Sequence, residues 1–335
     1  MKTYRIAVLP GDGIGPEVVD SALKVLDAAQ KTGNFKLEYI FGEAGFSAIN
    51  KHGTNLPEGT IKILKSAHAC LKGPMTTPEE EGAPISVAVQ IRKMFDLYAN
   101  VRPCRTYPNA SGMKGVDLVI VRENTEGLYS GKERKIKGGA IAERIITEKA
   151  SERIAEFGFR MAEGRGKKLT YVHKANILRM TDGIFNRAVL RVARRYPEIR
   201  VEGMHVDAAA MQLVKNPQQF DVIVTTNLFG DILSDEAAQI AGGVGLAPSA
   251  NIGEKYAMFE PVHGSAPKYA GKGIANPIAA ILACKMMLDY LGEGKAGKAI
   301  ENAVVKGLAG RKILTRDLGG KTSTRKAGEI MAGMI

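Results

Sequence analysis

The chain has 335 residues, of which 45% are hydrophobic, and its formal net charge is +12. This length exceeds one comfortable hydrophobic core and predicts two domains, while the absence of a long uncharged apolar run excludes a membrane span. The charge suits nucleic acid, an acidic membrane or an acidic small substrate, but Lys and Arg are spread along the chain without a basic tail, which argues against nucleic acid.

Strand-like and helix-like segments alternate along the chain. In order, we expect strands at 4–9, 36–41, 69–73, 116–124 and 168–176, separated by helices at 16–29, 57–67 and 147–162, then a helix ending at 193, strand–helix units at 201–214 and 220–238, a glycine-rich boundary at 241–248 and a helix at 277–292. This alternation predicts an α/β fold with a largely parallel sheet and a second region inserted in the middle.

The segment GDGIG at 11–15 stands where a Rossmann phosphate-binding turn would lie, between a strand and a helix. The Rossmann fingerprint requires glycines at its first, third and sixth positions, but here the sixth position is Pro16. Glu38 would be the candidate for the acidic ribose ligand. A tight turn with Pro16 at the start of a helix is the better interpretation.

Three arginines, Arg92, Arg102 and Arg122, lie in or beside short apolar runs, near the expected strand ends. The planar guanidinium group binds carboxylates with two parallel hydrogen bonds. Each arginine alone would be read as a surface ion-pair partner. Three of them together favour a site for a polycarboxylate.

Asp231 and Asp235 are four residues apart at the start of an expected helix, so their carboxylates face the same way and suit one hard cation. Asp207 ends another strand. Helix capping is the alternative for Asp207 and Asp231, whereas Asp235 lies too deep in the helix for a cap. Tyr129 and Lys174 are candidate proton-transfer groups, provided that their surroundings move their pKa values toward neutrality.

The segment 259–277 has no periodicity and contains many glycines and small residues, together with His263 and Asn276. Such a loop lets backbone N–H groups approach the phosphates of a ligand closely. We therefore expect part of a nucleotide site here.

Taken together, these segments resemble the β-decarboxylating dehydrogenase family, which contains isocitrate, homoisocitrate, 3-isopropylmalate and tartrate dehydrogenases. The resemblance covers nearly the whole chain, and its most specific parts are TTNLFGDILSD and HGSAP. The matching motifs are GDGIGPE at 11–17, DLYANVRP at 96–103, VRENTEGLY at 121–129, HKAN at 173–176, TTNLFGDILSDEAA at 225–238 and PVHGSAPKYAGKGIANP at 261–277.

The resemblance implies a two-domain isopropylmalate dehydrogenase-like α/β fold, unrelated to Rossmann, and a homodimer or a higher homo-oligomer. A first, cofactor-side domain would join residues 1–97 to 242–335 around an inserted second domain, 98–241, which carries the dimer interface. Members oxidise a (2R,3S)-2-hydroxy-3-carboxy acid with NAD(P) and Mg²⁺ or Mn²⁺, and then release the 3-carboxyl group as CO₂.

The resemblance also implies a role for each candidate residue. Arg92, Arg102 and Arg122 would bind the substrate carboxylates, and Tyr129 would protonate the enol. Metal would be held by Asp231 and Asp235 with Asp207 of the partner subunit, which also supplies Lys174 as the base for the hydroxyl proton. The expected cofactor residues are Thr76, Thr77, Asn176, Glu260, His263, Gly264, Ser265, Ala266, Lys268, Tyr269, Asn276 and Arg325.

Ser86, six residues before Arg92, resembles the serine of isocitrate and several homoisocitrate enzymes, where it binds a distal carboxylate. Val89 and Ala88 supply an apolar wall. We therefore expect a homoisocitrate dehydrogenase that also accepts isocitrate, which would place the chain in lysine biosynthesis; 3-isopropylmalate is the alternative substrate.

The nucleotide expected from the sequence is NADP. NAD-linked members usually have an aspartate after HGSAP that binds the ribose, whereas this chain has Lys268 and Tyr269, with Arg325 further on. Because a cation in place of an anion suits a 2′-phosphate, the charge favours NADP over NAD.

Two explanations of another class are a non-catalytic basic binding protein and a regulatory subunit, but a regulatory subunit should have lost an arginine, the tyrosine or a metal-binding aspartate. The three cysteines are widely spaced, which fits reduced thiols in the cytoplasm rather than a zinc site. The first nine residues are too short for a signal sequence, and the abundant Lys, Arg and Glu are typical of a heat-stable surface.

Overall fold

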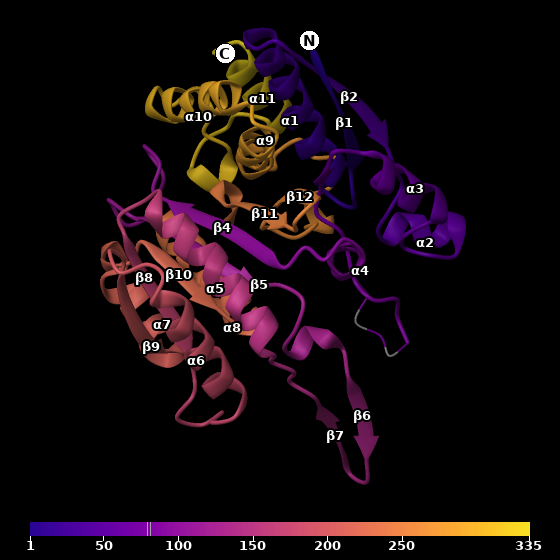
Figure 1. The fold of residues 1–335 in the computed structure, drawn as a ribbon. Coiled ribbons are helices and arrows are strands. Elements are labelled where there is room, and N and C mark those ends of the chain that lie inside the picture. The colour runs from indigo at the N-terminus through magenta and orange to yellow at the C-terminus, as the bar shows by residue number, and fades with distance from the viewer. Residues whose placement is uncertain (79, 81) are drawn as a thin grey trace.

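The computed structural model describes residues 1–78, 80 and 82–335. Its main sheet contains the strands β1 (Lys2–Leu9), β2 (Phe35–Phe41), β3 (Ala69–Lys72), β4 (Ala99–Arg105), β5 (Asp117–Glu123), β8 (Lys168–His173), β9 (Arg200–His205), β10 (Val222–Thr225), β11 (Pro248–Ile252) and β12 (Ala257–Pro261). A separate hairpin pairs β6 (Glu133–Ile136) with β7 (Gly139–Ala142) and projects from the body of the molecule (Figure 1).

The helices are α1 (Gly15–Ala29), α2 (Phe46–His52), α3 (Glu58–Ser66), α4 (Val87–Met94), α5 (Glu148–Glu163), α6 (Thr181–Ala193), α7 (Val206–Lys215), α8 (Asn227–Ala241), α9 (Ile278–Tyr290), α10 (Gly294–Ala309) and α11 (Thr324–Ala332). Within the described ranges, no helix has the length and apolar character needed to cross a membrane.

The sheet order is β2-β1-β3-β12-β11-β4-β5-β10-β8-β9. Both outer parts of the sheet are parallel, as the alternation of strands and helices predicts. In the middle, however, β11 runs antiparallel to β12 and β4, and β4 runs antiparallel to β5. The sheet is therefore largely parallel, as expected, and the exception is its centre, where a short turn joins β11 to β12.

The GDGIG segment forms the tight turn that the sequence predicts, and α1 follows it with Pro16 in its first turn. Gly11 and Gly13 have positive φ angles, and a Cβ at either would lie about 2 Å from the carbonyl oxygen of Pro74 or Ser265. Asp12 accepts hydrogen bonds from the backbone N–H groups of Phe46, Ser47 and Thr76. The turn therefore joins three chain segments, and this is no Rossmann phosphate loop.

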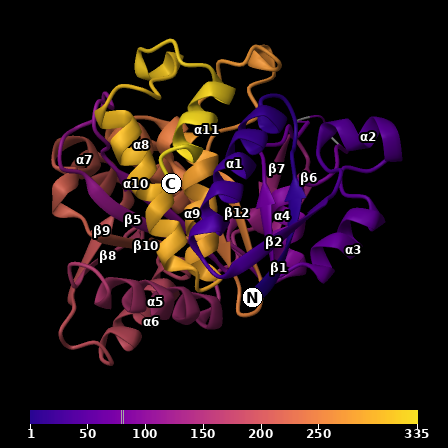
Figure 2. The same cartoon turned by 90° about the horizontal axis from the view of Figure 1, so that it is seen from above.

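The sheet buries both faces. On one face, paired residues such as Val101 and Val121 pack into a core with α1, α5, α9 and α10; Figure 2 shows α9 beside α1 and α10. The opposite face carries two smaller apolar clusters, one under α7 and α8 and the other under α3 and α4. The gap between these two clusters is where the polar residues gather.

The helices form two groups along the sheet (Figure 1). Both chain ends lie with α1, α9, α10 and α11 in one group, and α5 to α8 form the other. The expected domain junctions, at 97/98 and 241/242, fall just before β4 and at the end of α8. The division into domains stays a prediction.

Candidate active site

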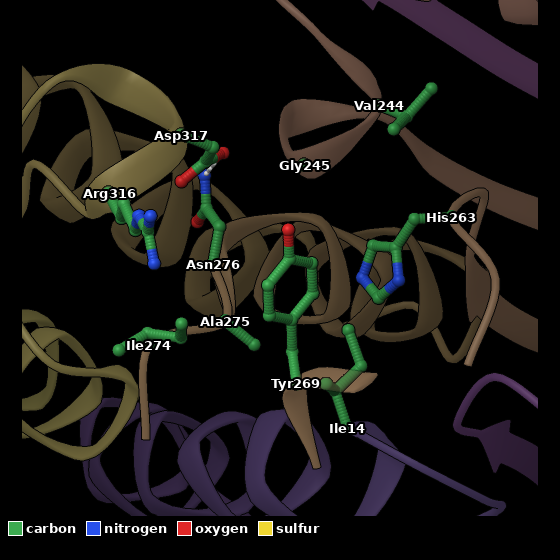
Figure 3. A pocket seen from close by; sticks show the side chains of 10 residues that line it. All are labelled: Ile14, Val244, Gly245, His263, Tyr269, Ile274, Ala275, Asn276, Arg316 and Asp317. Carbon is green, nitrogen blue, oxygen red and sulfur yellow. Dashed lines mark hydrogen bonds between the residues drawn. The ribbon is translucent and has the colours of Figure 1, made fainter. Parts of the chain in front are cut away.

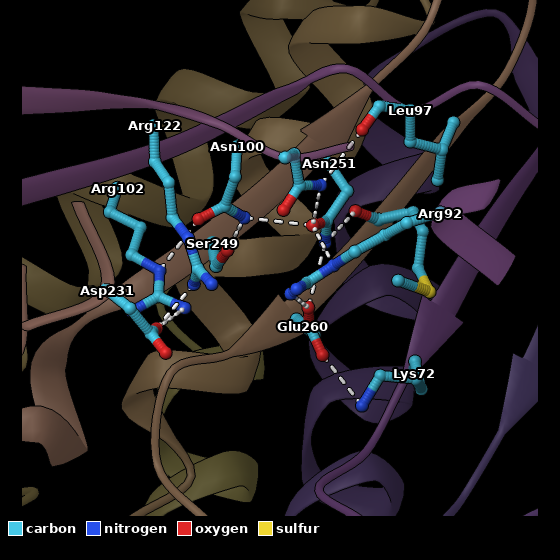
Figure 4. Close-up of polar contacts among 12 residues, drawn as sticks. Lys72, Arg92, Leu97, Asn100, Arg102, Arg122, Asp231, Ser249, Asn251 and Glu260 are labelled. Atoms are coloured by element: carbon cyan, nitrogen blue, oxygen red, sulfur yellow. Dashed lines mark hydrogen bonds and ion pairs between the residues drawn. The ribbon is translucent and has the colours of Figure 1, made fainter. Parts of the chain in front are cut away.

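A row of polar side chains crosses the middle of the sheet on one face (Figure 4). Residues that lie directly opposite one another on neighbouring strands point to the same face, and the register pairs Ser249 with Glu260, Asn251 with Asn100, and Asn100 with Arg122. On β5, for example, the apolar residues Leu118 and Ile120 belong to one of the smaller clusters, and Arg122, two residues further on, belongs to the polar row. The row thus lies on the floor of the gap between α4 and α8.

The three predicted arginines meet at this row, and all are buried: Arg92, Arg102 and Arg122 are 6%, 7% and 1% exposed. Arg122 lies near the end of β5, but Arg102 is in the middle of β4 and Arg92 is in the last turn of α4. Their expected placement near strand ends therefore holds for Arg122 and is wrong for Arg102 and Arg92; Arg92 approaches the sheet from a helix. Burial, followed by repulsion from the two other arginines, lowers the pKa of Arg122 to about 10.

Asp231 and Asp235 reach the arginines from α8. Arg122 and Arg102 both form ion pairs with Asp231, the latter at 3.1 Å, and Arg102 also pairs with Asp235 at 3.0 Å. Burial opposes ionisation of Asp231, but the guanidinium charges outweigh it and hold its pKa below the usual value. Because Thr226 occupies the N-cap position of α8 and Asp231 lies in the second turn, the capping alternative for Asp231 is wrong.

The donor set of these two carboxylates fits part of a site for a hard divalent cation. Oxygen ligands four residues apart on one helix suit Mg²⁺, which keeps several water or substrate ligands. Within the part of the chain that the structure describes, no three His, Cys, Asp or Glu side chains are grouped as a metal would need.

Tyr129 lies in a short 3₁₀ turn after β5 and joins the same cluster. Its hydroxyl donates a hydrogen bond to Asp231, and the guanidinium carbon of Arg122 lies 4.8 Å from the centre of its ring. Burial raises the pKa of Tyr129, so the expected shift toward neutrality is wrong for this residue. The phenol stays protonated and can still act as a hydrogen-bond donor.

Lys174 and Asp207 lie elsewhere. They follow β8 and begin α7, and the Nζ of Lys174 forms an ion pair with Oδ1 of Asp207. The N-cap of α7 is His205, so the capping alternative for Asp207 is wrong as well. Neither side chain forms a hydrogen bond or ion pair with the arginines or with Asp231, among the residues described. The backbone N–H of Lys174 donates to the buried Asp182, at 2.6 Å.

A pocket of about 180 Å³ opens onto two of the arginines, Arg92 and Arg102. Ser86 and Ala88 line it with Arg92 and Arg102, whereas Val89, on α4, is partly buried and does not line it. The sequence analysis missed Lys72, a buried lysine of this pocket, whose Nζ lies 2.7 Å from a carboxylate oxygen of Glu260. Burial opposes ionisation of Glu260, yet Lys72 and Arg92 lower its pKa to about 2.

A second pocket, of about 420 Å³, contains three predicted cofactor residues, His263, Tyr269 and Asn276 (Figure 3). The sequence analysis missed Arg316 and Asp317, which also line it; Asp317 accepts a hydrogen bond from Asn276 at 2.9 Å. Arg316 and Asp317 follow α10 as an ordinary pair of charged residues, and no motif in the sequence marks them as part of a binding site.

His263 lines both pockets and connects them. Burial lowers the pKa of its ring, and its Nε2 is a buried atom without a partner among the described residues. An unpaired ring nitrogen at the junction of an acid-binding and a larger pocket fits a nucleotide that extends across both.

The other predicted cofactor residues are more scattered. Thr76 and Ser265 share a hydrogen bond of 2.7 Å, and Gly264 lines the smaller pocket. Lys268 lies over the ring of Tyr269. The remaining predicted cofactor residues, Thr77, Asn176, Ala266 and Arg325, line neither pocket. Thr77 and Asn176 are exposed, and Ala266 precedes a 3₁₀ turn. Arg325 is exposed and pairs with Glu329 on α11.

Comparisons with known proteins agree with this geometry. The isocitrate/homoisocitrate dehydrogenase of Thermus thermophilus is 52% identical over 96% of this chain and 95% of its own length. The 3-isopropylmalate dehydrogenase of Methanothermobacter thermautotrophicus is 50% identical over 97% and 96%. The crystal structure of isocitrate dehydrogenase from Methylococcus capsulatus superposes with a TM-score of 0.94, at 44% identity, covering 99% of both chains.

The family model for isocitrate/isopropylmalate dehydrogenases matches residues 5–331, nearly the entire chain. Members of this family are NAD(P)-dependent decarboxylating dehydrogenases that act on small hydroxy acids and use a divalent metal. The α/β fold, the match along the chain and the cluster of arginines with aspartates agree, and the chain belongs to the isocitrate/isopropylmalate dehydrogenase family.

Proposed function

We propose that the chain catalyses the oxidative decarboxylation of a (2R,3S)-2-hydroxy-3-carboxy acid, with homoisocitrate and isocitrate as its substrates. The observation that carries this proposal is the cluster of three buried guanidinium groups: Arg92 and Arg102 line a pocket that also contains Ser86, and Arg122 shares Asp231 with Arg102. The hydroxyl of Ser86, which lines the same pocket, suits a further carboxylate.

The chain's own residues divide the chemical work. Removal of the C2 hydroxyl proton and the C2 hydride gives a 2-oxo acid, loss of the 3-carboxyl group as CO₂ leaves an enol, and Tyr129 returns a proton to C3. Arg92, Arg102 and Arg122 bind and orient the carboxylates, and Lys174 of a second subunit receives the hydroxyl proton. Asp231 and Asp235 would hold the divalent cation, which would supply a Lewis acid for the C2 oxygen, and the nicotinamide would supply the hydride acceptor.

For the nucleotide we propose NADP. Arg316 lines the larger pocket, and Lys268 lies over the ring of Tyr269, which also lines it. Two cations in or near this pocket support binding of a 2′-phosphate. Arg325, which the sequence analysis favoured, is engaged by Glu329 instead. The assignment therefore moves from Arg325 to Arg316.

We further propose a cytoplasmic homodimer in which Lys174 and Asp207 complete the site of the neighbouring subunit. Their separation from the arginine cluster within one chain supports this arrangement. A non-catalytic binding protein or a regulatory subunit would not need the full set of arginines, Tyr129 and aspartates that this buried cluster retains.

The second candidate substrate is 3-isopropylmalate. Ala88 lines the pocket and Val89 lies beside it, so the wall near the distal substituent is partly apolar. One relative with 50% identity is also named a 3-isopropylmalate dehydrogenase.

Steady-state assays with homoisocitrate, isocitrate and 3-isopropylmalate, each with NAD and NADP in the presence of Mg²⁺, test these proposals. We expect the highest kcat/KM with a tricarboxylate and NADP. The distal carboxylate of the acid and the 2′-phosphate of the nucleotide are both anionic, and the two pockets contain the cations Arg92, Arg102 and Arg316. A higher kcat/KM for 3-isopropylmalate would overturn the proposal that Ser86 binds a distal carboxylate. A higher kcat/KM with NAD than with NADP would overturn the proposal that Arg316 binds a 2′-phosphate.

A further inference from the structure

Asn251, in β11, is a fully buried side chain at the centre of the polar row (Figure 4). Its Oδ1 accepts hydrogen bonds from Arg92 Nε at 2.9 Å, Asn100 Nδ2 at 2.9 Å and Asn124 Nδ2 at 3.0 Å. Its Nδ2 donates to Glu260 Oε1 at 2.8 Å. One amide therefore contacts an arginine, a carboxylate and two further amides at once.

Asn100 extends this arrangement to the next arginine. Its Oδ1 accepts from Arg102 Nε at 2.8 Å, while its Nδ2 donates to Asn251. A continuous chain of hydrogen bonds therefore runs from Arg102 through two amides to Arg92.

The direction of every bond in this chain is fixed by its ends. A guanidinium group can only donate, so both amide oxygens must face an arginine. The ionised carboxylate of Glu260 can only accept, so the amide nitrogen of Asn251 must face it. Neither amide can rotate by 180° without placing like groups together, and the chain has one arrangement.

Arg92 depends on this chain more than the other arginines do. Arg102 is also bound by Ser234 and Asp235 of α8, and Arg122 by Asn227 and Asp231. Arg92 comes from α4 on the opposite side of the pocket, and its polar partners among the described residues are Asn251 and Glu260. Without Asn251, its guanidinium group would be free to turn fully onto Glu260 and away from the pocket.

We propose that Asn251 is a positioning residue that holds Arg92 at a fixed spacing from Arg102, and that this spacing matches the carboxylates of the substrate. The inference rests on the proposed function for the identity of the ligand. Asn251 acts through Arg92 and does not itself touch the substrate.

Asn251→Leu tests this inference, with Asn124→Leu as the matched control. Both changes remove one buried amide from the same cluster without altering charge, but the amide of Asn124 donates to Leu97 and Asn251 rather than to an arginine or Glu260. The measurements are the Kd of isocitrate with Mg²⁺ by calorimetry, and kcat, KM and Tm for the full-length protein.

We expect Asn251→Leu to raise the Kd and KM for isocitrate about tenfold or more, while kcat at saturation stays within about threefold. Asn124→Leu should lower Tm to a similar extent with Kd unchanged within about twofold. Should Asn251→Leu not fold, Asn251→Ala removes the same hydrogen bonds to Arg92 and Glu260 with a smaller side chain and carries the same expectation.

Equal effects of the two leucine variants on Kd would show that Asn251 serves stability alone and would overturn the inference, with the proposed function intact. A wild-type protein that neither binds nor oxidises any of the three acids would instead overturn the proposed function, and the inference with it.

Discussion

At the scale of single residues, substitution of Arg316 tests whether the protein prefers NADP to NAD. Arg325 is one of the cations that the sequence predicts near the 2′-phosphate, yet it is exposed and paired with Glu329. Arg316 instead lines the larger pocket, together with Asn276. A hydrogen bond to a charged group contributes about 1.5–3 kcal/mol. We therefore expect Arg316→Ala to lower kcat/KM for NADP about tenfold or more and to leave that for NAD nearly unchanged.

The control is Lys321→Ala, which removes the same charge from an exposed position outside the pocket lining. Steady-state assays with both nucleotides measure the two variants side by side. If Lys321→Ala shifts the NADP preference as much as Arg316→Ala, the effect is one of overall charge and the assignment of Arg316 fails.

The sequence predicts candidate site residues by their type, but not residues that would act through their neighbours. Arg102, Arg122 and Asp231 are candidates because three arginines and a pair of aspartates recur in short motifs, and the structure brings these three together. Lys72 and Asn251 were missed because their importance comes from the pairing of β3, β12, β11 and β4, strands far apart in the chain. Which residues face one another on neighbouring strands cannot be read from the sequence of a single chain.

At the scale of elements, long periodic segments were predictable and short ones were not. The helix expected at 147–162 is observed as α5, Glu148–Glu163, since its apolar face repeats over four turns. In contrast, α4 has eight residues and was read as an apolar run, which led to the wrong placement of Arg92. The hairpin β6–β7 has an exposed pattern without alternation, so nothing marked it as strand.

The approach of α8 to β5 depends on Gly230, which occupies the middle of a helix where alanine would ordinarily be more stable by about 1 kcal/mol. A Cβ there would lie 2.7 Å from Cβ and Cγ of Arg122. We expect Gly230→Ala to destabilise the protein by about 1–3 kcal/mol and to raise KM for the acid, because Arg122 must move. Thermal unfolding and steady-state assays measure both.

Gly59→Ala in α3 is the matched control, since the residue is exposed and a Cβ added to it would meet no described atom within 4 Å. It should leave Tm unchanged or raise it slightly, with KM unaffected. A harmless Gly230→Ala would mean that α8 can move away from β5 without disturbing the arginines.

At the scale of the whole molecule, the α/β class and the family followed from motifs spread over nearly the entire chain. The antiparallel centre of the sheet did not, because β11 and β12 are short strands joined by a short turn, inside a region read as a glycine-rich boundary and a loop. That centre supplies Asn251 and Glu260, so the part that was least predictable is the part that organises the arginines.

The proposed division of each site between two subunits predicts complementation. In a dimer of Lys174→Met with Asp231→Asn chains, one site would combine the intact Asp231 of the first chain with the intact Lys174 of the second, and the other site would carry both changes. Each variant alone should be nearly inactive. Random pairing gives about half mixed dimers with one working site each, so co-expression should restore about a quarter of wild-type activity.

Two different affinity tags allow the mixed dimer to be purified, and its activity should then rise to about half of the wild-type value. Mixing Asp231→Asn with Asp235→Asn chains is the control, because both carboxylates come from the same chain and neither possible site is intact. If Lys174 and Asp231 acted within one chain, every mixed dimer would likewise lack an intact site. An inactive, purified mixed dimer would therefore contradict the shared site while leaving the arginine cluster and its substrate in place.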